Sequence, residues 1–115
     1  MKSSIGSPTD KDVRRFQLMQ ETGCVSCIQL GIFGNPGDVH HLLYAGKRIS
    51  HQHTICLCTW HHRGHHDVLS DKLAYERFGP SLAKTKKEFH DKFGDNEDLL
   101  WFQNELLRRV EESIV

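Results

Sequence analysis

Two short pairs of metal-binding residue types with the same spacing constrain this chain more than any other feature. "CVSC" supplies Cys24 and Cys27, and after thirty intervening residues "CTWH" supplies Cys58 and His61. A two-residue gap lets both side chains of a pair reach one tetrahedral ion from a tight turn. CxxC followed by CxxH is the spacing of a closed structural zinc site. The pattern therefore predicts that these four residues bind structural zinc.

Other uses of the cysteines stay open at the level of sequence. A redox-active CxxC normally begins a helix within a βαβ unit, and that pattern is missing around Cys24. Cys56 would share a strand face with Cys58, so it either replaces His61 as a ligand or is a small buried side chain near the site. With 115 residues and 37% hydrophobic content, the apolar core is lean, which also favours stabilisation by a metal.

Charge and hydropathy restrict the compartment and the partners. The start, "MKSSIGSPTDKD", lacks the apolar segment of a secretory signal, and no stretch has the length of a membrane span. We therefore expect a cytoplasmic protein without a membrane partner, where reducing conditions favour metal over disulfides. Fifteen basic residues balance fifteen acidic ones, so any binding of nucleic acid must use local charge.

The remaining pattern predicts one α+β domain over residues 10–115, preceded by a flexible lead over residues 1–9. A capping box of Thr9 and Asp12 begins an amphipathic helix that ends near Gly23. Two short strands are expected around 39–44 and 54–57. Further helices are expected from about residue 62 to Gly79, from 84 to Gly94, and from Asp95 onward, with Pro80 suited to the first position of a helix.

Histidine is concentrated in one part of the sequence. Six of the nine histidines lie between residues 51 and 66, and His40 and His41 stand just upstream. If His61 binds the structural zinc, seven of these eight histidines are left without a role. Their number indicates a second metal-centred site. His62 and His66 are four residues apart, so on one helix they can bind the same ion. His40 and His41 face opposite sides of a strand, so one can bind metal while the other activates water.

The strings "DVHHLL", "HTICLC" and "HHRGHH" together resemble the HNH (ββα-metal) nuclease motif with its zinc ribbon. The fuller pattern is similar to the phage-encoded Ref family of RecA-dependent HNH nucleases. This resemblance covers roughly residues 23–80 and rests on CxxC, HH, GxR, LC and HHRG in that order. It implies a small zinc-stabilised ββα-metal core with an N-terminal helix and additional C-terminal helices.

The resemblance also implies roles for individual residues. His41 corresponds to the general base, and His40 to a ligand of a catalytic metal. His62 is the last histidine of the motif and a second ligand, and His66, one turn later, is a further candidate ligand.

The middle position of the motif is filled by either His51 or His53, and the sequence leaves this choice open. Lys47, Arg48 and Arg63 flank the expected site and are the candidate DNA-binding residues, since cations beside the chemistry can bind phosphate.

The function implied by the resemblance is a metal-dependent DNA endonuclease that leaves 5′-phosphate and 3′-hydroxyl ends, in phage recombination or DNA processing within a bacterial host. The expected cofactors are structural Zn²⁺ and an active-site Mg²⁺, Mn²⁺ or Zn²⁺; histidine ligands favour the softer ions.

RecA filaments on single-stranded DNA are an expected partner. Their requirement stays open because no basic run precedes Cys24, where Ref proteins can carry a long basic region. Two alternatives are a non-catalytic, zinc-stabilised DNA-binding module and a metal-handling or sensor protein with several weak sites.

Overall fold

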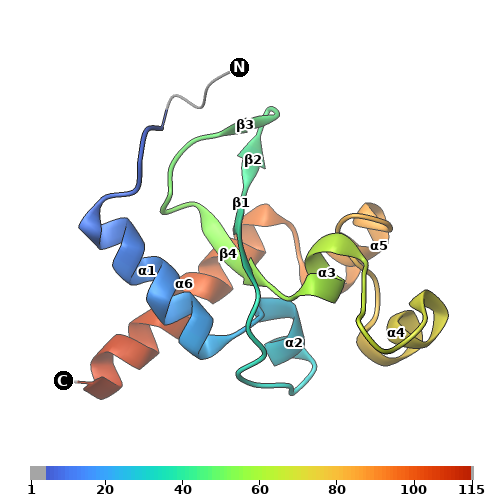
Figure 1. The fold of residues 1–115 in the computed structure, drawn as a ribbon. Helices are drawn as coiled ribbons and strands as arrows, with labels where there is room; N and C mark the ends of the chain where they lie inside the picture. Colours follow the sequence, from blue (N-terminus) through green and yellow to red (C-terminus); the bar gives the residue numbers. More distant parts are fainter. Residues whose placement is uncertain (1–4, 115) are drawn as a thin grey trace.

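The structure, a computed structural model, describes residues 5–114. The described part is mixed α+β, as predicted, with two separate two-stranded antiparallel sheets among helices (Figure 1). Its elements in chain order are α1 (Asp10–Thr22), α2 (Val25–Gln29), β1 (Asp38–His41), β2 (Leu43–Tyr44), β3 (Lys47–Arg48), β4 (Thr54–Leu57), α3 (Thr59–Arg63), α4 (Asp71–Phe78), α5 (Lys86–Phe93) and α6 (Asn96–Ile114).

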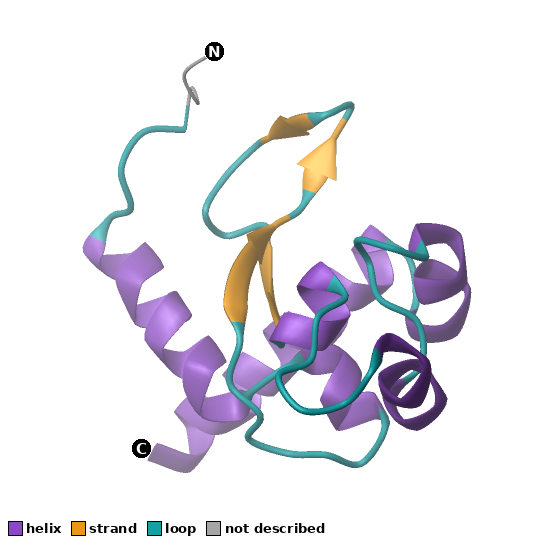
Figure 2. Ribbon diagram, turned by 45° about the vertical axis from the view of Figure 1, so that its right-hand side comes forward, coloured by secondary structure: helices purple, strands orange, loops and turns teal. Residues whose placement is uncertain are grey.

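The central ladder joins two strands that are separated in the sequence by the loop carrying β2 and β3. β1 and β4 pair antiparallel, with Val39 opposite Cys56 and His41 opposite Thr54. Figures 1 and 2 both place this ladder between α1 on one side and α3 on the other. β4 is buried along its whole length because α1, α2 and α6 all pack against it.

The connection between β1 and β4 forms a second hairpin that projects away from the helices (Figure 1). β2 and β3 pair antiparallel around Ala45 and Gly46, whose φ angles of 52° and 77° are both left-handed. A two-residue turn of this kind matches the natural twist of a β-hairpin. The strand expected over 39–44 is therefore divided between two ladders.

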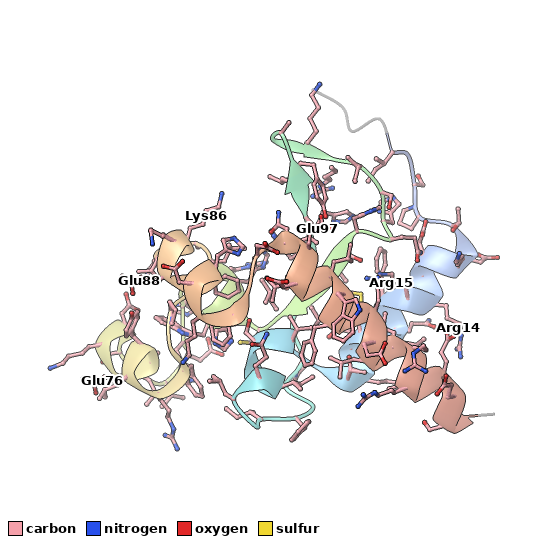
Figure 3. All side chains as sticks on the ribbon, turned by 180° about the vertical axis from the view of Figure 1, so that it is seen from behind. Arg14, Arg15, Glu76, Lys86, Glu88 and Glu97 are labelled. Atoms are coloured by element: carbon pink, nitrogen blue, oxygen red, sulfur yellow. The ribbon has the colours of Figure 1, made fainter. Side chains whose placement is uncertain are left out.

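The N-terminal helix agrees with its prediction. Thr9 and Asp12 form the expected capping box, and Gly23 ends α1. Arg15 on α1 is 8% exposed, and its hydrogen bonds connect α1 to β4 and α6. Figure 3 shows Arg15 from behind. Its guanidinium donates to the side chain and carbonyl of Thr54 on β4, at 2.9 and 2.7 Å, and to the side chain of Asn104 on α6 at 2.8 Å.

The prediction of one helix from about residue 62 to Gly79 is wrong. α3 ends at Arg63, because Gly64 takes a left-handed φ of 69° and caps it. α4 begins only after Ser70, whose side chain accepts the backbone N–H of Leu73. Pro80 begins no helix, and α5 starts at Lys86 instead. A glycine cap and a serine N-cap thus interrupt what the sequence suggested was continuous.

The C-terminal helix α6 packs against both core clusters. Asp95 accepts the backbone N–H of Asp98, as expected of a cap for α6. Leu99 on this helix joins the main core, and Leu107 joins a second cluster with Met19 and Cys56. Across residues 5–114, no helix combines the length and the apolar character needed to cross a membrane.

Candidate metal centre and histidine cluster

The four predicted zinc ligands converge in the core. All four residues are buried, and their ligand atoms lie within 4.8 Å of one another. Sγ of Cys27 is 3.7 Å from Sγ of Cys58, and Nδ1 of His61 is 3.5 Å from Sγ of both Cys24 and Cys27. Tetrahedral zinc with its usual bond lengths separates two sulfurs by about 3.8 Å and a sulfur from a nitrogen by about 3.5 Å. The group could therefore hold a zinc ion.

Local structure explains this convergence. Cys24 and Cys58 are the N-cap residues of α2 and α3, and each sulfur accepts the backbone N–H three residues later, from Cys27 and His61. The Nε2–H of His61 donates to the carbonyl of Phe78 at 2.9 Å. This bond leaves Nδ1 as the ligand atom, because a carbonyl acting on one ring nitrogen fixes the tautomer at the other.

The pKa values of the thiols and the imidazole in this cluster are shifted by burial and by their mutual hydrogen bonds. Burial raises the pKa of the Cys24 thiol well above its usual range. Burial alone would lower the pKa of His61, but hydrogen bonds with the thiols of Cys27 and Cys58 raise it to about 9. A bound divalent ion would replace the protons that the thiols and the imidazole share in these hydrogen bonds, since zinc ligands must be deprotonated.

Cys56 does not belong to this group. It is fully buried and packs against Leu18, Met19 and Leu107 in the second core cluster. Of the two alternatives for this residue, the structure agrees with the small buried side chain.

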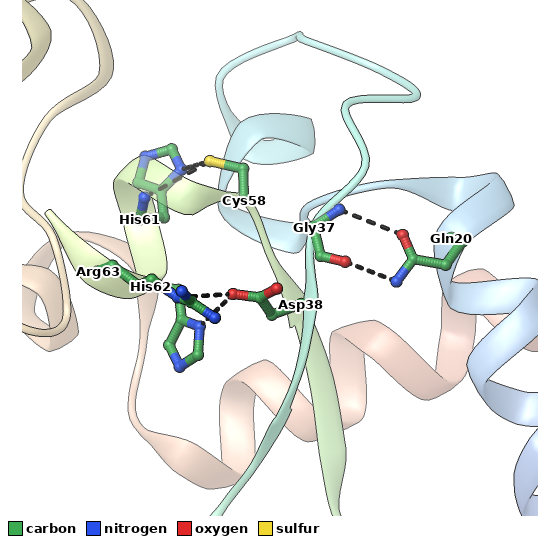
Figure 4. A network of polar contacts seen from close by, with 7 residues as sticks. All are labelled: Gln20, Gly37, Asp38, Cys58, His61, His62 and Arg63. Carbon is green, nitrogen blue, oxygen red and sulfur yellow. Dashed lines mark hydrogen bonds and ion pairs between the residues drawn. The ribbon is translucent and has the colours of Figure 1, made fainter. Parts of the chain in front are cut away.

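A second cluster of polar side chains lies where β1 faces α3. Asp38 and His40 are two residues apart on β1 and so share one strand face. Nδ1 of His62 is 2.9 Å from Oδ2 of Asp38, and Nε of Arg63 donates to the same oxygen at 3.0 Å (Figure 4). The rings of His40 and His62 are 4.9 Å apart between centroids. β1 and α3 thus bring these groups together.

The bond to Asp38 determines what His62 can do. A carboxylate only accepts, so neutral His62 carries its proton on Nδ1 and keeps a lone pair on Nε2. Burial lowers the pKa of His40 to about 4, with a smaller contribution from charge repulsion by His62. This lowered pKa keeps the His40 imidazole neutral at physiological pH. Neutral imidazoles are the ligand form of histidine. Asp38 was not among the predicted site residues, although its D-x-H spacing on a strand indicated it.

His41 faces the opposite side of β1 and contacts other residues. Its Nε2 is 2.9 Å from Nδ1 of His51, and Nε2 of His51 is 2.9 Å from the carbonyl oxygen of Gly6. Burial lowers the pKa of His41, with a further contribution from Arg48. His53 instead bonds the Ser50 hydroxyl through its Nδ1 at 2.7 Å. The structure therefore brings His41 together with His51.

His66 lies apart from the helix that was expected to carry it. Its Nδ1 accepts the backbone N–H groups of Val68 and Leu69 at 3.1 and 2.9 Å. Its ring stacks on Phe78, 5.6 Å between centroids and 15° between planes. Because α3 ends at Arg63, the shared helix face that grouped His66 with His62 does not exist.

The candidate DNA-binding cations lie on two elements. Lys47 and Arg48 form β3 on the projecting hairpin and are exposed. They border a hollow of about 500 Å³ together with Ser50 and His51. Arg63, with a side chain 65% exposed, stands at the end of α3 beside Asp38.

These features define a small α+β protein with a buried group of three cysteines and one histidine that could hold zinc, and with a separate cluster of histidines. The model of the family described as "Recombination enhancement, RecA-dependent nuclease" matches residues 8–108, and the chain belongs to this family. The match confirms the resemblance to the Ref family. No curated protein matches the chain. By its description, the family consists of nucleases that act in recombination and depend on RecA.

Proposed function

We propose that this chain is an HNH-type, metal-dependent DNA endonuclease that hydrolyses phosphodiester bonds and leaves 5′-phosphate and 3′-hydroxyl ends. One observation carries the proposal: an antiparallel strand pair followed by a short helix places His40 beside His62, with His62 oriented by Asp38. The adjacent residue on β1, His41, is held by His51. Two imidazole ligands and a neighbouring base are the groups that metal-assisted hydrolysis of a phosphodiester needs.

The residues then take separate roles. His40 and His62 would hold a divalent ion, Mg²⁺, Mn²⁺ or Zn²⁺, which when bound neutralises charge on the phosphate and on the departing 3′ oxygen. His41 takes the proton from the attacking water, and its lowered pKa keeps it unprotonated for that task. We assign His51 rather than His53 to the middle motif position. His66, which lies outside α3, stays a predicted additional ligand through its Nε2 alone, because its Nδ1 accepts the backbone N–H groups of Val68 and Leu69.

We propose DNA as the substrate and a RecA filament on single-stranded DNA as the partner that directs cutting. The family description, a RecA-dependent nuclease of recombination enhancement, supports a nucleic-acid substrate and a dependence on RecA. The test is conversion of supercoiled plasmid to nicked and linear forms with Mn²⁺ or Mg²⁺, and cutting of single-stranded DNA with and without a RecA filament. Cutting that requires both the metal and His41 supports the proposal, and metal-independent cutting contradicts it.

Replacing Asp38 with asparagine should weaken binding of the catalytic metal. The amide keeps the size of the side chain but removes the charge that orients His62, so we expect about 10–100-fold lower affinity for Mn²⁺. The measurement is a Mn²⁺ titration of the zinc-loaded protein by calorimetry. Asp67→Asn is the matched control, because Asp67 is exposed and forms its ion pair with His65, at 3.4 Å, and not with His62. Equal affinities for the two variants would remove Asp38 from the site.

Replacing Arg48 with glutamine should weaken DNA binding in a salt-dependent way. Each lost phosphate contact lowers the slope of log affinity against log salt by about one. The measurement is fluorescence anisotropy of labelled DNA between low and moderate salt. Lys87→Gln is the control, since Lys87 is already paired with Asp91 at 2.7 Å on α5. An unchanged slope for Arg48→Gln would show that β3 does not contact the DNA backbone.

A further inference from the structure

The segment that precedes α1, residues 5–9, contacts His51, and His51 in turn contacts the histidine that the proposed function makes the base. The carbonyl oxygen of Gly6 is 2.9 Å from Nε2 of His51, whose Nδ1 is 2.9 Å from Nε2 of His41. We propose that Gly6 and His51 are positioning residues: through this chain of hydrogen bonds, the N-terminal segment fixes the tautomer and orientation of His41. The inference rests on the proposed role of His41.

The tautomers follow from which atoms can donate. A carbonyl oxygen only accepts, so Nε2 of His51 must carry a proton. Nδ1 of neutral His51 then carries a lone pair and accepts, which requires the proton of His41 to be on Nε2. The remaining nitrogen of His41, Nδ1, therefore keeps its lone pair. One backbone carbonyl, far upstream of β1 in the sequence, sets the state of both rings.

The same arrangement suits the chemical step. When His41 takes a proton from water on Nδ1, the ring becomes a cation, and its Nε2–H still donates to His51. The hydroxide that remains forms a bond to phosphorus as the bond between phosphorus and the 3′ oxygen breaks, and the departing 3′ oxygen takes a proton from solvent. No proton on the His51 side has to move. If Gly6 did not hold His51, that ring could carry its proton on Nδ1 and donate to His41. His41 would then be protonated on Nδ1 and could not act from that atom.

Further contacts hold the loop that carries His51 against the start of α1. Asp12 accepts the side-chain amide of Gln52 at 2.6 Å. Thr54, which accepts from Arg15, donates its hydroxyl to the carbonyl of His51 at 2.8 Å.

Phe16 on α1 also packs against the two histidine rings. The ring of Phe16 meets the His41 and His51 rings edge-on, at centroid distances of 6.4 and 6.0 Å. Phe16 thus packs against His41 and His51, and the carbonyl of Gly6 is the acceptor at the end of the hydrogen-bond chain.

Gly6 allows a test that leaves the rest of the protein intact. Its φ is +68°, and a Cβ built there meets nothing within 4 Å. Substitution therefore acts through the backbone alone. Valine strongly disfavours a left-handed φ, so Gly6→Val should move the carbonyl away, whereas Gly6→Asn is the matched control because asparagine tolerates this region.

The first readout is long-range ¹H–¹⁵N NMR of the histidine rings in the full, zinc-loaded chain, which distinguishes the two tautomers. We expect His41 and His51 to carry their protons on Nε2 in the native chain and in Gly6→Asn, and to lose that preference in Gly6→Val. Either ring protonated on Nδ1 in the native chain, or an unaltered Gly6→Val spectrum, overturns the inference. These readouts do not depend on activity, so absence of nicking with the expected tautomers would count against the proposed function alone.

The second readout is plasmid nicking. Gly6→Val should lower kcat about three- to tenfold with KM unchanged, because the cations that bind DNA are not altered. His51→Asn should retain most activity, since its amide can donate to Gly6 and accept from His41, while His51→Leu should not. Equal kcat for His51→Asn and His51→Leu would overturn the positioning role.

Discussion

Substitution of Cys58 by serine should abolish both tight zinc binding and the cooperative fold. Cys58 is a corner of the buried ligand group and also the N-cap of α3, which carries His61 and His62. Structural zinc contributes about 10–16 kcal/mol of binding free energy in small zinc domains, which is as large as the whole stability of a typical domain. We therefore expect less than one zinc per chain and loss of the thermal unfolding transition.

Cys56→Ala is the matched control for the zinc prediction. Cys56 is equally buried but packs among apolar side chains, so this substitution should cost only about 1 kcal/mol of unfolding free energy and leave the zinc content at one per chain. The measurements are elemental analysis of purified protein and thermal unfolding by circular dichroism. A Cys58→Ser protein that stays folded with bound zinc would contradict the assignment of the ligands.

Replacing His41 with alanine should remove DNA cleavage while leaving the fold in place. A general base typically contributes about 10²–10⁴-fold to the rate, so we expect nicking to fall by at least 100-fold. His41 is partly exposed at the end of β1, and the buried core does not depend on its ring. The measurement is the initial rate of plasmid nicking with Mn²⁺ at a fixed protein concentration.

His53→Ala is the control for His41→Ala. It lies on the same loop as His51 but bonds Ser50 and packs on Tyr44 instead of His41. Its nicking rate should stay within a few-fold of the native rate. A large loss for His53→Ala with little loss for His51→Leu would reverse our choice between the two residues for the middle motif position.

The buried group of three cysteines and one histidine could be predicted from sequence because its geometry is largely short-range. A CxxC or CxxH turn brings two ligands together within four residues, whatever the rest of the chain does. The capping box of α1 and the glycine that ends it are local in the same way, and both agree with the structure.

Features that depend on tertiary contacts could not be predicted. The partner of His41 depends on where a long loop returns to β1, and spacing alone did not separate His51 from His53. His66 was grouped with His62 by an i, i+4 rule that holds only inside a helix, and Gly64 ends that helix. The role of Gly6 depends on a contact across 45 positions of the chain, which no local pattern reports.

The central claim is tested most directly by plasmid nicking with zinc-loaded protein freed of other metals, with and without added Mn²⁺, for the native chain and His41→Ala in parallel. We predict nicking only by the native chain and only with the added ion. Equal nicking by both proteins, or nicking by the native chain without the added ion, would contradict a metal-dependent nuclease that uses His41 as its base.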